Sequence, residues 1–393
     1  MTAPEIHLVA GTRPEAIKIA PVALELAAAG RMRPVIVASG QHPGMIGQAL
    51  RAFALVPDEE FILRRATGSQ AELYSALLPE FHELWTRRRP DAVLVQGDTA
   101  SAVAAALAAF WLRIPVVHLE AGLRSHDLDS PFPEEANRRL IATVAALHLA
   151  PTPRAAEHLR AEGIGEERIL TVGNTAVDAV RVISSRNREF AEPALSEMEE
   201  LARTGARRLV LVTVHRRESW GAPMRRVLAA VRTMLREHPD VQVVLPAHPN
   251  PAVRQEVERA LAGEPRALVT APLDYPDLVR LLRGCVLALS DSGGIQEEAP
   301  SFGVPVLILR DTTERQEAVE WGCATLVGTE EAAITAAAAE ALARPARAGG
   351  PYANPFGDAA TGARAEHALA WLLGLAAAPR PAWDAVPGGV LTA

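Results

Sequence analysis

The sequence predicts an α/β fold with two doubly wound domains, and three observations support this. Short apolar runs of four to six residues alternate with longer helical stretches along almost the whole chain. Apolar runs of this length between helices are typical of parallel strands that are buried on both faces. The pattern occurs as two successive series, and 393 residues suit two domains of ordinary size. We therefore expect two parallel sheets, each covered by helices.

The expected elements follow one another in a regular order. In the first half, strands are predicted at 6–10, 35–38, 92–96, 115–119 and 147–150, with helices between them that include 44–53, 70–85 and 100–112. In the second half, strands are predicted at 209–213, 242–246, 267–270, 286–290, 304–309 and 324–327. Sheets of this kind bind ligands beyond the carboxyl ends of their strands. Polar residues that follow the strands are therefore the candidates for a site.

Two segments mark the domain boundaries. The chain has a polar turn at 171–175 and a segment rich in Gly, Pro and Ala at 345–355. We place an N-terminal domain at 1–172 and a C-terminal domain at 173–357. A last helix, predicted over 358–375, is expected to pack back on the first domain. Residues 376–393 carry three prolines and a Gly-Gly pair, and are expected to form a loosely ordered tail.

Composition excludes several classes of protein. A net charge of −7 and a pI near 5.9 give no sign of nucleic-acid binding. The first residues lack the basic and apolar regions of a signal peptide, and the longest apolar stretch, 102–112, is about half a membrane span. Cys285 and Cys323 lie in or beside apolar runs, which indicates buried thiols in a reducing compartment. We expect a soluble cytoplasmic protein.

Two glycine turns predict sites for anions. Ser292, Gly293 and Gly294 stand between an apolar strand and a helix-forming stretch, and the segment 11–18 begins in the same way after the first strand. Backbone N–H groups and the positive end of the helix dipole meet at such turns, and glycine lets an anion approach closely. The alternative is a tight turn with no ligand. Two such turns in two halves of the chain favour a ligand that carries a diphosphate.

Four ionisable residues follow the predicted strands or open a helix, and they are the catalytic candidates: Asp98, Glu120, Glu134 and His215. Each also has a structural interpretation. Asp98 suits a helix cap, and Glu120 is four residues from Arg124, which could be its partner in an ion pair. Glu134 suits the first turn of a helix, and His215 suits a satisfied polar group at a strand end. Their convergence on the strand ends favours a site.

The second predicted domain offers two further binding residues. Glu298, one turn into the helix after the glycine turn, could accept both hydroxyls of a ribose; the alternative is a solvated helix face. An arginine of the segment Arg310 to Arg315, which follows the strand at 304–309, could pair with a phosphate in a bidentate fork. The alternative is a surface ion pair. The chain has no zinc-binding, serine-nucleophile or nicotinamide fingerprint, so we expect neither a metal nor a cofactor.

Eight segments together give a resemblance to the non-hydrolysing UDP-N-acetylglucosamine 2-epimerases. In the family's order they are 11–18, 97–99, 120–124, 133–138, 173–175, 215–219, 291–300 and 310–315. The two longest read Gly11-Thr-Arg-Pro-Glu-Ala-Ile-Lys18 and Asp291-Ser-Gly-Gly-Ile-Gln-Glu-Glu-Ala-Pro300. The resemblance runs from about Ile6 to Leu373.

The resemblance implies a fold, a reaction and a set of contacts. It implies two Rossmann-like domains facing a cleft, as in GT-B-type glycosyltransferases, usually in a homodimer. It implies interconversion of UDP-N-acetylglucosamine and UDP-N-acetylmannosamine without nicotinamide. The residues implied to contact the UDP-sugar are Arg13, Lys18, Asp98, Glu120, His215, Ser292, Gly293, Gly294, Glu298 and Arg315.

The chain departs from the family at a few positions. Pro43 stands where many relatives have an arginine associated with a regulatory UDP-sugar, which puts substrate activation in doubt. Leu273 and Leu278 replace residues that are often Gln and aromatic, so we expect apolar and backbone contacts to uracil there. The alternatives to this function are a sister epimerase that acts on another UDP-2-acetamido sugar and a glycosyltransferase of the same fold.

Overall fold

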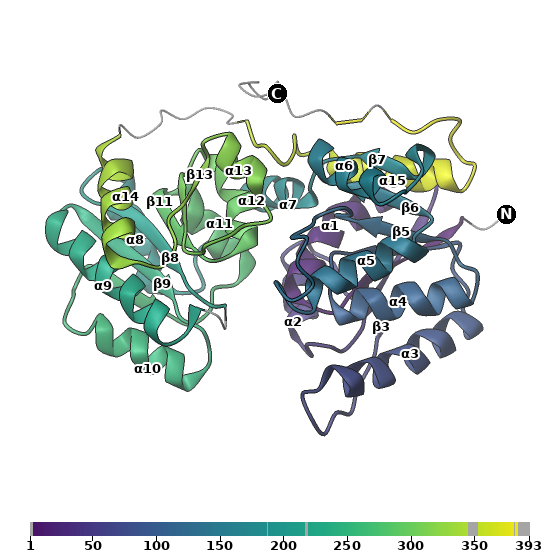
Figure 1. The fold of residues 1–393 in the computed structure, drawn as a ribbon, viewed down its shortest axis with the longest axis horizontal. Helices are drawn as coiled ribbons and strands as arrows, with labels where there is room; N and C mark the ends of the chain where they lie inside the picture. The colour runs from purple at the N-terminus through teal and green to yellow at the C-terminus, as the bar shows by residue number, and fades with distance from the viewer. Residues whose placement is uncertain (1–2, 187, 217–218, 345–352, 381, 384–393) are drawn as a thin grey trace. The chain divides into compact units, whose positions relative to one another are not determined.

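The structure divides into two compact units. The computed structural model describes all residues except 1–2, 187, 217–218, 345–352, 381 and 384–393 (Figure 1). The first unit takes the chain up to Val182 and again from Phe356, and the second takes Ile183 to Pro355. The change of unit lies within α7 (Thr175–Ser184), whereas the sequence placed it at 172/173.

The start of α7 belongs to the first unit because its side chains are buried there. Asp178 of α7 accepts a hydrogen bond from the backbone N–H of Gly362 at 2.8 Å, at the start of α15 (Thr361–Leu372). Burial raises the pKa of Asp178 to about 6. Helix α15 packs against α1 (Arg13–Ala29), where Arg31 donates two hydrogen bonds of 2.6 Å to Glu366.

The first unit contains a sheet of seven parallel strands in the order β3-β2-β1-β4-β5-β6-β7. The strands are β1 (Glu5–Ala10), β2 (Arg33–Ala38), β3 (Glu59–Glu60), β4 (Ala92–Gln96), β5 (Val116–Leu119), β6 (Leu147–Ala150) and β7 (Ile169–Thr171). Its other helices are α2 (Met45–Arg51), α3 (Gln70–Arg87), α4 (Ala100–Trp111), α5 (Glu134–Val144) and α6 (Pro153–Ala161).

The second unit contains a sheet of six parallel strands in the order β10-β9-β8-β11-β12-β13. The strands are β8 (Arg208–Thr213), β9 (Val241–Pro246), β10 (Ala267–Thr270), β11 (Cys285–Ser290), β12 (Val306–Ile308) and β13 (Ala324–Leu326). The helices are α8 (Pro193–Arg203), α9 (Ala222–Glu237), α10 (Pro251–Ala260), α11 (Tyr275–Arg283), α12 (Gly293–Glu298), α13 (Gln316–Glu320) and α14 (Glu331–Ala343).

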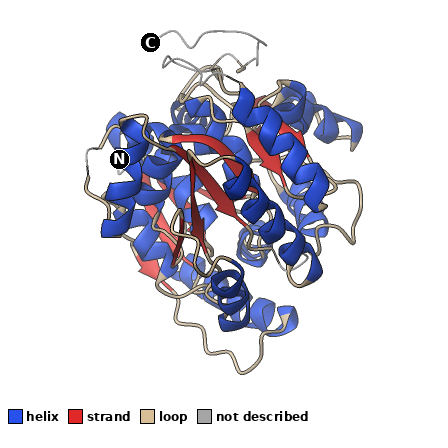
Figure 2. Ribbon diagram, turned by 90° about the vertical axis from the view of Figure 1, so that its left-hand side faces the viewer, coloured by secondary structure: helices blue, strands red, loops and turns tan. Residues whose placement is uncertain are grey.

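Each sheet lies between helices (Figure 2). In the first unit, α3, α4 and α5 bury the alternate valines of the sheet, such as Val9, Val37 and Val95. In the second unit, α9, α10 and α14 bury the corresponding face of β8, β9 and β11. Side chains on both faces of a strand are buried by such layers, which explains why the strands are nearly continuous apolar runs. The predicted α/β fold class with two doubly wound sheets is confirmed.

The structure also bears on the remaining predictions from composition. Both cysteines are free thiols, and burial raises the pKa of Cys285. Within the described ranges, no helix has the length and apolar character needed to cross a membrane. Most of the predicted tail, 384–393, lies outside the described residues. In the part that is described, the backbone N–H of Trp383 donates to the carbonyl of Thr171 at 2.9 Å.

Candidate functional site

The candidate residues gather where the strand order reverses in each sheet. This reversal lies between β1 and β4 in the first unit and between β8 and β11 in the second. Doubly wound sheets bind their ligands outside the carboxyl ends of the strands at this point. Asp98 follows β4, Glu120 follows β5, and His215 and Ser292 follow β8 and β11. The topology therefore gives each unit one cluster of candidate side chains.

Glu120 is the most constrained candidate of the first unit. Its backbone is left-handed, with φ of 65°, a conformation that costs a residue with a side chain about 1–3 kcal/mol. Its Oε2 accepts hydrogen bonds from Lys18 Nζ at 2.5 Å and from Gln96 Nε2 at 2.6 Å. The alternative of an ion pair with Arg124 is wrong, because Arg124 forms a bidentate pair with Glu162 at 2.7 Å. Glu120 is thus a buried carboxylate held by donors from α1 and β4.

Asp98 is held by helix α5. Its Oδ2 accepts hydrogen bonds from Arg138 Nε at 2.8 Å and Nη2 at 2.7 Å, and its carbonyl accepts one from Asn137 Nδ2 at 2.7 Å. The alternative role as a helix cap is wrong, because Thr99 caps α4 by accepting from Ala102 N. A quarter of the Asp98 side chain is exposed to solvent. It is therefore oriented and still accessible.

Buried histidine His118 supports the turn that carries Asp98. Its Nε2 lies 2.8 Å from the carbonyl oxygen of Gly97, which has φ of 69°. Burial, together with the charges of Arg124 and Arg138, lowers the pKa of His118 to about 4. The ring is neutral at pH 7, so Nε2 carries the proton and donates to the carbonyl.

The expectation of an anion site on the backbone of the first glycine turn is wrong. The N–H groups of Gly11 and Thr12 donate to Glu15 Oε2 at 3.0 and 2.7 Å, so helix α1 is capped by its own carboxylate. Glu15 Oε1 also accepts a hydrogen bond from Thr99 at 2.7 Å. Burial raises the pKa of Glu15 to about 7 despite these donors. The sequence showed the turn but not its occupant.

Two more candidates lie at helix starts in the first unit. Arg13 is the first residue of α1 and is half-buried. Glu134 is the first residue of α5, one turn before Arg138, and is also half-buried. Their positions agree with a place at the carboxyl side of the sheet, and their roles stay predictions.

In the second unit, a buried carboxylate organises the segment that carries His215. Asp291, which is inaccessible to solvent, accepts hydrogen bonds from the backbone N–H groups of His215 and Arg216 and from Ser219 Oγ, at 2.9 to 3.2 Å. His215 Nδ1 lies 3.3 Å from Asp291 Oδ1, and half of the His215 side chain is exposed. The neighbouring Arg217 and Glu218 lie outside the described residues. Asp291 thus fixes the backbone and the imidazole of His215, with one side of the ring exposed.

Replacing Asp291 by Asn is expected to lower both stability and turnover. The amide oxygen can still accept from the three donors at Oδ2, but it carries no full charge, and the N–H₂ group then stands at Oδ1 and faces His215. A hydrogen bond to a charged group contributes about 1.5–3 kcal/mol and one between neutral groups about 0.5–1.5 kcal/mol, so stability falls. Thermal unfolding should shift to lower temperature, and turnover should fall further than in an Arg216→Ala variant. An Asn variant with unchanged melting temperature and turnover would contradict this role for Asp291.

The glycine turn of the second unit brings together five of the predicted residues. A Cβ atom at Gly293 would lie 2.9 Å from Arg315 Cζ, so the absence of a side chain makes room for the guanidinium. A Cβ atom at Gly294 would lie 3.7 Å from Ser292 Oγ and 3.9 Å from Glu298 Oε1. Ser292, Glu298 and Arg315 therefore surround the two glycines.

Arg315 is paired with carboxylates. Its Nε and Nη2 lie 2.9 and 2.8 Å from Glu297 Oε1, and its Nη1 lies 3.5 Å from Glu314 Oε2. Glu314 also accepts from Arg310 at 3.2 Å. The pairs fix the orientation of the guanidinium but offset its charge. Its role toward a phosphate stays a prediction.

The two leucines predicted near uracil stand five residues apart in the chain and differ in burial. Leu273 is buried just before α11, and Leu278 is half-buried within that helix. Asp274 caps the helix by accepting from Asp277 N. Both leucines are apolar, and their contact with a base stays a prediction.

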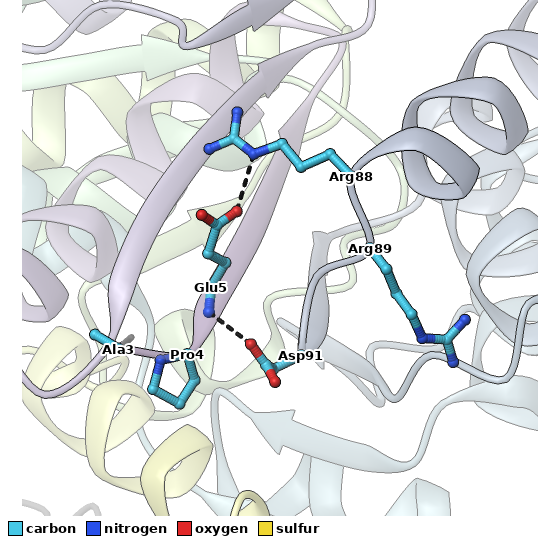
Figure 3. A pocket seen from close by; sticks show the side chains of 6 residues that line it. All are labelled: Ala3, Pro4, Glu5, Arg88, Arg89 and Asp91. Carbon is cyan, nitrogen blue, oxygen red and sulfur yellow. Dashed lines mark hydrogen bonds and ion pairs between the residues drawn. The ribbon is translucent and has the colours of Figure 1, made fainter. Parts of the chain in front are cut away.

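A pocket of about 370 Å³ lies away from these residues (Figure 3). It is lined by Ala3, Pro4, Glu5, Arg88, Arg89 and Asp91. Glu5 and Asp91 stand at the amino ends of β1 and β4, opposite to the strand ends that carry Asp98. Arg88 is paired with Glu5 at 2.9 Å, as the dashed line shows. The pocket is therefore no part of the candidate site.

Three supporting residues were missed by the sequence reasoning: Gln96, Arg138 and Asp291. Each lay within or beside one of the motifs, but only Gln96 had a signal of its own. Gln96 is a polar residue at the end of an apolar strand, which was the one available clue. Contacts such as Lys18 with Glu120 join residues 102 positions apart, so local pattern does not reveal them.

Comparisons with known proteins agree with this geometry. The family model described as UDP-N-acetylglucosamine 2-epimerase matches residues 24–370. A relative named probable UDP-N-acetylglucosamine 2-epimerase, from Ralstonia nicotianae, is 43% identical over 370 residues, which cover 93% of this chain and 98% of the relative.

Solved structures extend the likeness to the fold. The UDP co-structure of S. aureus MnaA is 35% identical with a TM-score of 0.88, covering 97% of this chain and 100% of the other. The Neisseria meningitidis UDP-GlcNAc 2-epimerase, solved bound to UDP-GlcNAc, is 35% identical with a TM-score of 0.84, covering 94% and 100%. The resemblance in the sequence motifs is thus confirmed, and the chain belongs to the UDP-N-acetylglucosamine 2-epimerase family.

Proposed function

We propose that this protein is an isomerase that interconverts UDP-N-acetylglucosamine and UDP-N-acetylmannosamine by inverting C2 of the sugar. The observation that carries the proposal is the pair of carboxylates Asp98 and Glu120, which follow neighbouring strands and are each held by a cation. Relatives that are solved with UDP or with UDP-GlcNAc support the choice of substrate. The proposal assigns the sugar to the first unit, and it assigns the diphosphate to residues of the second unit together with Arg13.

The proposed reaction begins at the anomeric carbon. The hydrogen on C2 is not adjacent to a carbonyl group, so a carboxylate cannot remove it directly at neutral pH. When the bond between C1 and the UDP oxygen breaks, its electron pair leaves with UDP and C1 becomes cationic. The C2 hydrogen is then acidic, and its loss to a carboxylate gives a glucal. Return of a proton to the opposite face of C2 and of UDP to C1 gives the epimer.

The chain's residues supply the groups that this reaction needs. We assign Asp98 and Glu120 to proton transfer at C2, with Glu134 in a supporting or relaying role. We assign Arg13, His215, Arg315 and the turn at Ser292 to the leaving diphosphate, whose charge grows as the bond breaks. Glu298 is proposed to accept the ribose hydroxyls. We place Lys18 near the sugar as well, because its Nζ donates a hydrogen bond to Glu120.

Incubation with UDP-N-acetylglucosamine in deuterated water tests the proposal. We expect deuterium at C2 and a manno product, both followed by proton NMR, because the abstracted proton exchanges before it returns. A manno product without deuterium would contradict the elimination. Accumulation of free UDP would indicate a hydrolysing enzyme or a glycosyltransferase. Exchange without a manno product, or no exchange at all, would favour the alternative functions over the one proposed.

Two more properties rest on the family resemblance and stay proposals. The first is a homodimer, which light scattering on the purified protein tests. The second is a cytoplasmic location, which fractionation of cells tests. Activation by a second molecule of substrate is not proposed, because Pro43 departs from the family there.

A further inference from the structure

Lys18 is the only lysine in the chain. The sequence contains 40 lysine and arginine residues, and the other 39 are arginine. A sequence that uses arginine almost everywhere for positive charge has kept one lysine. This position therefore requires a property of lysine that arginine lacks.

The single lysine lies in the candidate site. Its side chain is 10% exposed, and its Nζ donates to Glu120 Oε2 at 2.5 Å. The same oxygen accepts a hydrogen bond from Gln96 Nε2 at 2.6 Å. Both partners are buried, and Glu120 carries the left-handed backbone described above. Two short hydrogen bonds thus converge on one oxygen of a strained residue.

Arginine does not suit this place, for two physical reasons. A guanidinium is planar and carries five N–H donors, whereas an ammonium is compact and carries three. A guanidinium beside Glu120 and Gln96 would bring extra donors into a buried space, and each donor left without an acceptor costs about 1–3 kcal/mol. It would also displace the carboxylate, because it cannot occupy the volume of an ammonium nitrogen.

We propose that Lys18 is the positioning residue for Glu120 and that the reaction requires an ammonium at this place. The ammonium and the Gln96 amide fix the carboxylate in the orientation needed at C2, against the strain of its backbone. This inference rests on the proposed function. A displacement of about 1 Å in such a group can lower the rate about 100-fold.

Five proteins test the inference: the wild type, Lys18→Arg, Lys18→Met, Lys18→Cys and Gln96→Met. We expect Lys18→Arg to lose kcat about 100-fold or more, with KM changed less than three-fold and UDP affinity by calorimetry unchanged. Lys18→Met removes the charge as well and should lose at least as much. Gln96→Met, which keeps the ammonium but removes the second donor, should lose about ten-fold.

Chemical rescue distinguishes the loss of the ammonium from a general loss of folding in the variants. Alkylation of Lys18→Cys with 2-bromoethylamine forms a carbon–sulfur bond with loss of bromide and restores an ammonium at nearly the length of lysine. We expect at least a ten-fold recovery of kcat. The treated wild type is the control, since buried Cys285 and half-buried Cys323 are the other thiols.

The outcomes separate this inference from the proposed function. Lys18→Arg with more than a tenth of the wild-type kcat would overturn the requirement for an ammonium, and so would aminoethylated Lys18→Cys without recovery. A wild type that leaves UDP-N-acetylglucosamine unchanged would overturn the proposed function, and the inference with it.

Discussion

Replacing Asp98 by Asn is expected to lower the turnover of UDP-N-acetylglucosamine by about 10²–10⁴-fold and to leave UDP binding largely intact, because an amide cannot exchange a proton with C2. The fold should persist. Arg138, the partner of Asp98, also pairs with Glu135, and its Nη1 lies 3.3 Å from Glu135 Oε2. The substitution therefore does not leave a buried guanidinium without a carboxylate. Steady-state kinetics and calorimetry with UDP measure the two quantities.

Asp91 provides a matched control for this variant. It precedes β4, whereas Asp98 follows it, and its carboxylate accepts a hydrogen bond from Glu5 N at 2.8 Å at the far end of the sheet (Figure 3). Asp91→Asn is expected to leave turnover within two-fold of the wild type. Near-normal turnover in Asp98→Asn would remove this residue from the proposed proton transfer.

A second large effect is expected from pH, through a pair of histidines in the first sheet. His118 and His148 are partners in the register of β5 and β6, and both are fully buried. Neither ring nitrogen of His148 has a hydrogen-bond partner among the described residues. Burial, with repulsion from His118, Arg168 and Arg124, lowers the pKa of His148 to about 3, whereas the favourable charge of Glu162 opposes this.

The direction of the pH effect follows from these values. Above pH 6.5 both rings are neutral in the folded and the unfolded chain, so they add no pH dependence. As the pH falls below 6.5, the unfolded chain takes up protons that the folded chain excludes, and stability is lost. Between pH 6.5 and pH 4 each histidine accounts for about 3 kcal/mol, at 1.4 kcal/mol per pKa unit. Their sum is comparable to the whole stability of a typical domain.

We therefore expect the first unit to unfold in mild acid and His148→Phe to resist it. The variant keeps an aromatic ring in the sheet but cannot be protonated, so its acid midpoint should fall by at least half a pH unit in circular dichroism. His82→Gln, at an exposed position of α3, is the control and should behave as the wild type. Equal midpoints for wild type and His148→Phe would show that acid acts elsewhere.

The strands were predictable because burial on both faces imposes a local apolar pattern. Three strands, β4, β6 and β10, begin and end at the predicted residues. Strand β3 was not predicted, because Glu59–Glu60 is a two-residue edge strand with no apolar signal. The turns after the strands were predictable from glycine for the same local reason.

The partners of the site residues were not predictable from pattern. Proximity in sequence suggested Arg124 for Glu120, but the backbone turns at Glu120 and directs Arg124 to Glu162 instead. The Gly11 turn looked open to an anion, yet Glu15, one turn later, occupies its N–H groups. In both cases the deciding interaction depends on side-chain direction, which composition and spacing do not encode.

The bonds from Asp291 have a mechanical consequence. They join the segment after β8 to the segment after β11, so His215 and the Gly293–Gly294 turn belong to one stiff block. Any displacement of that block carries the imidazole and the turn by the same amount. A leaving group held there would meet both together, with their spacing already set before it arrives.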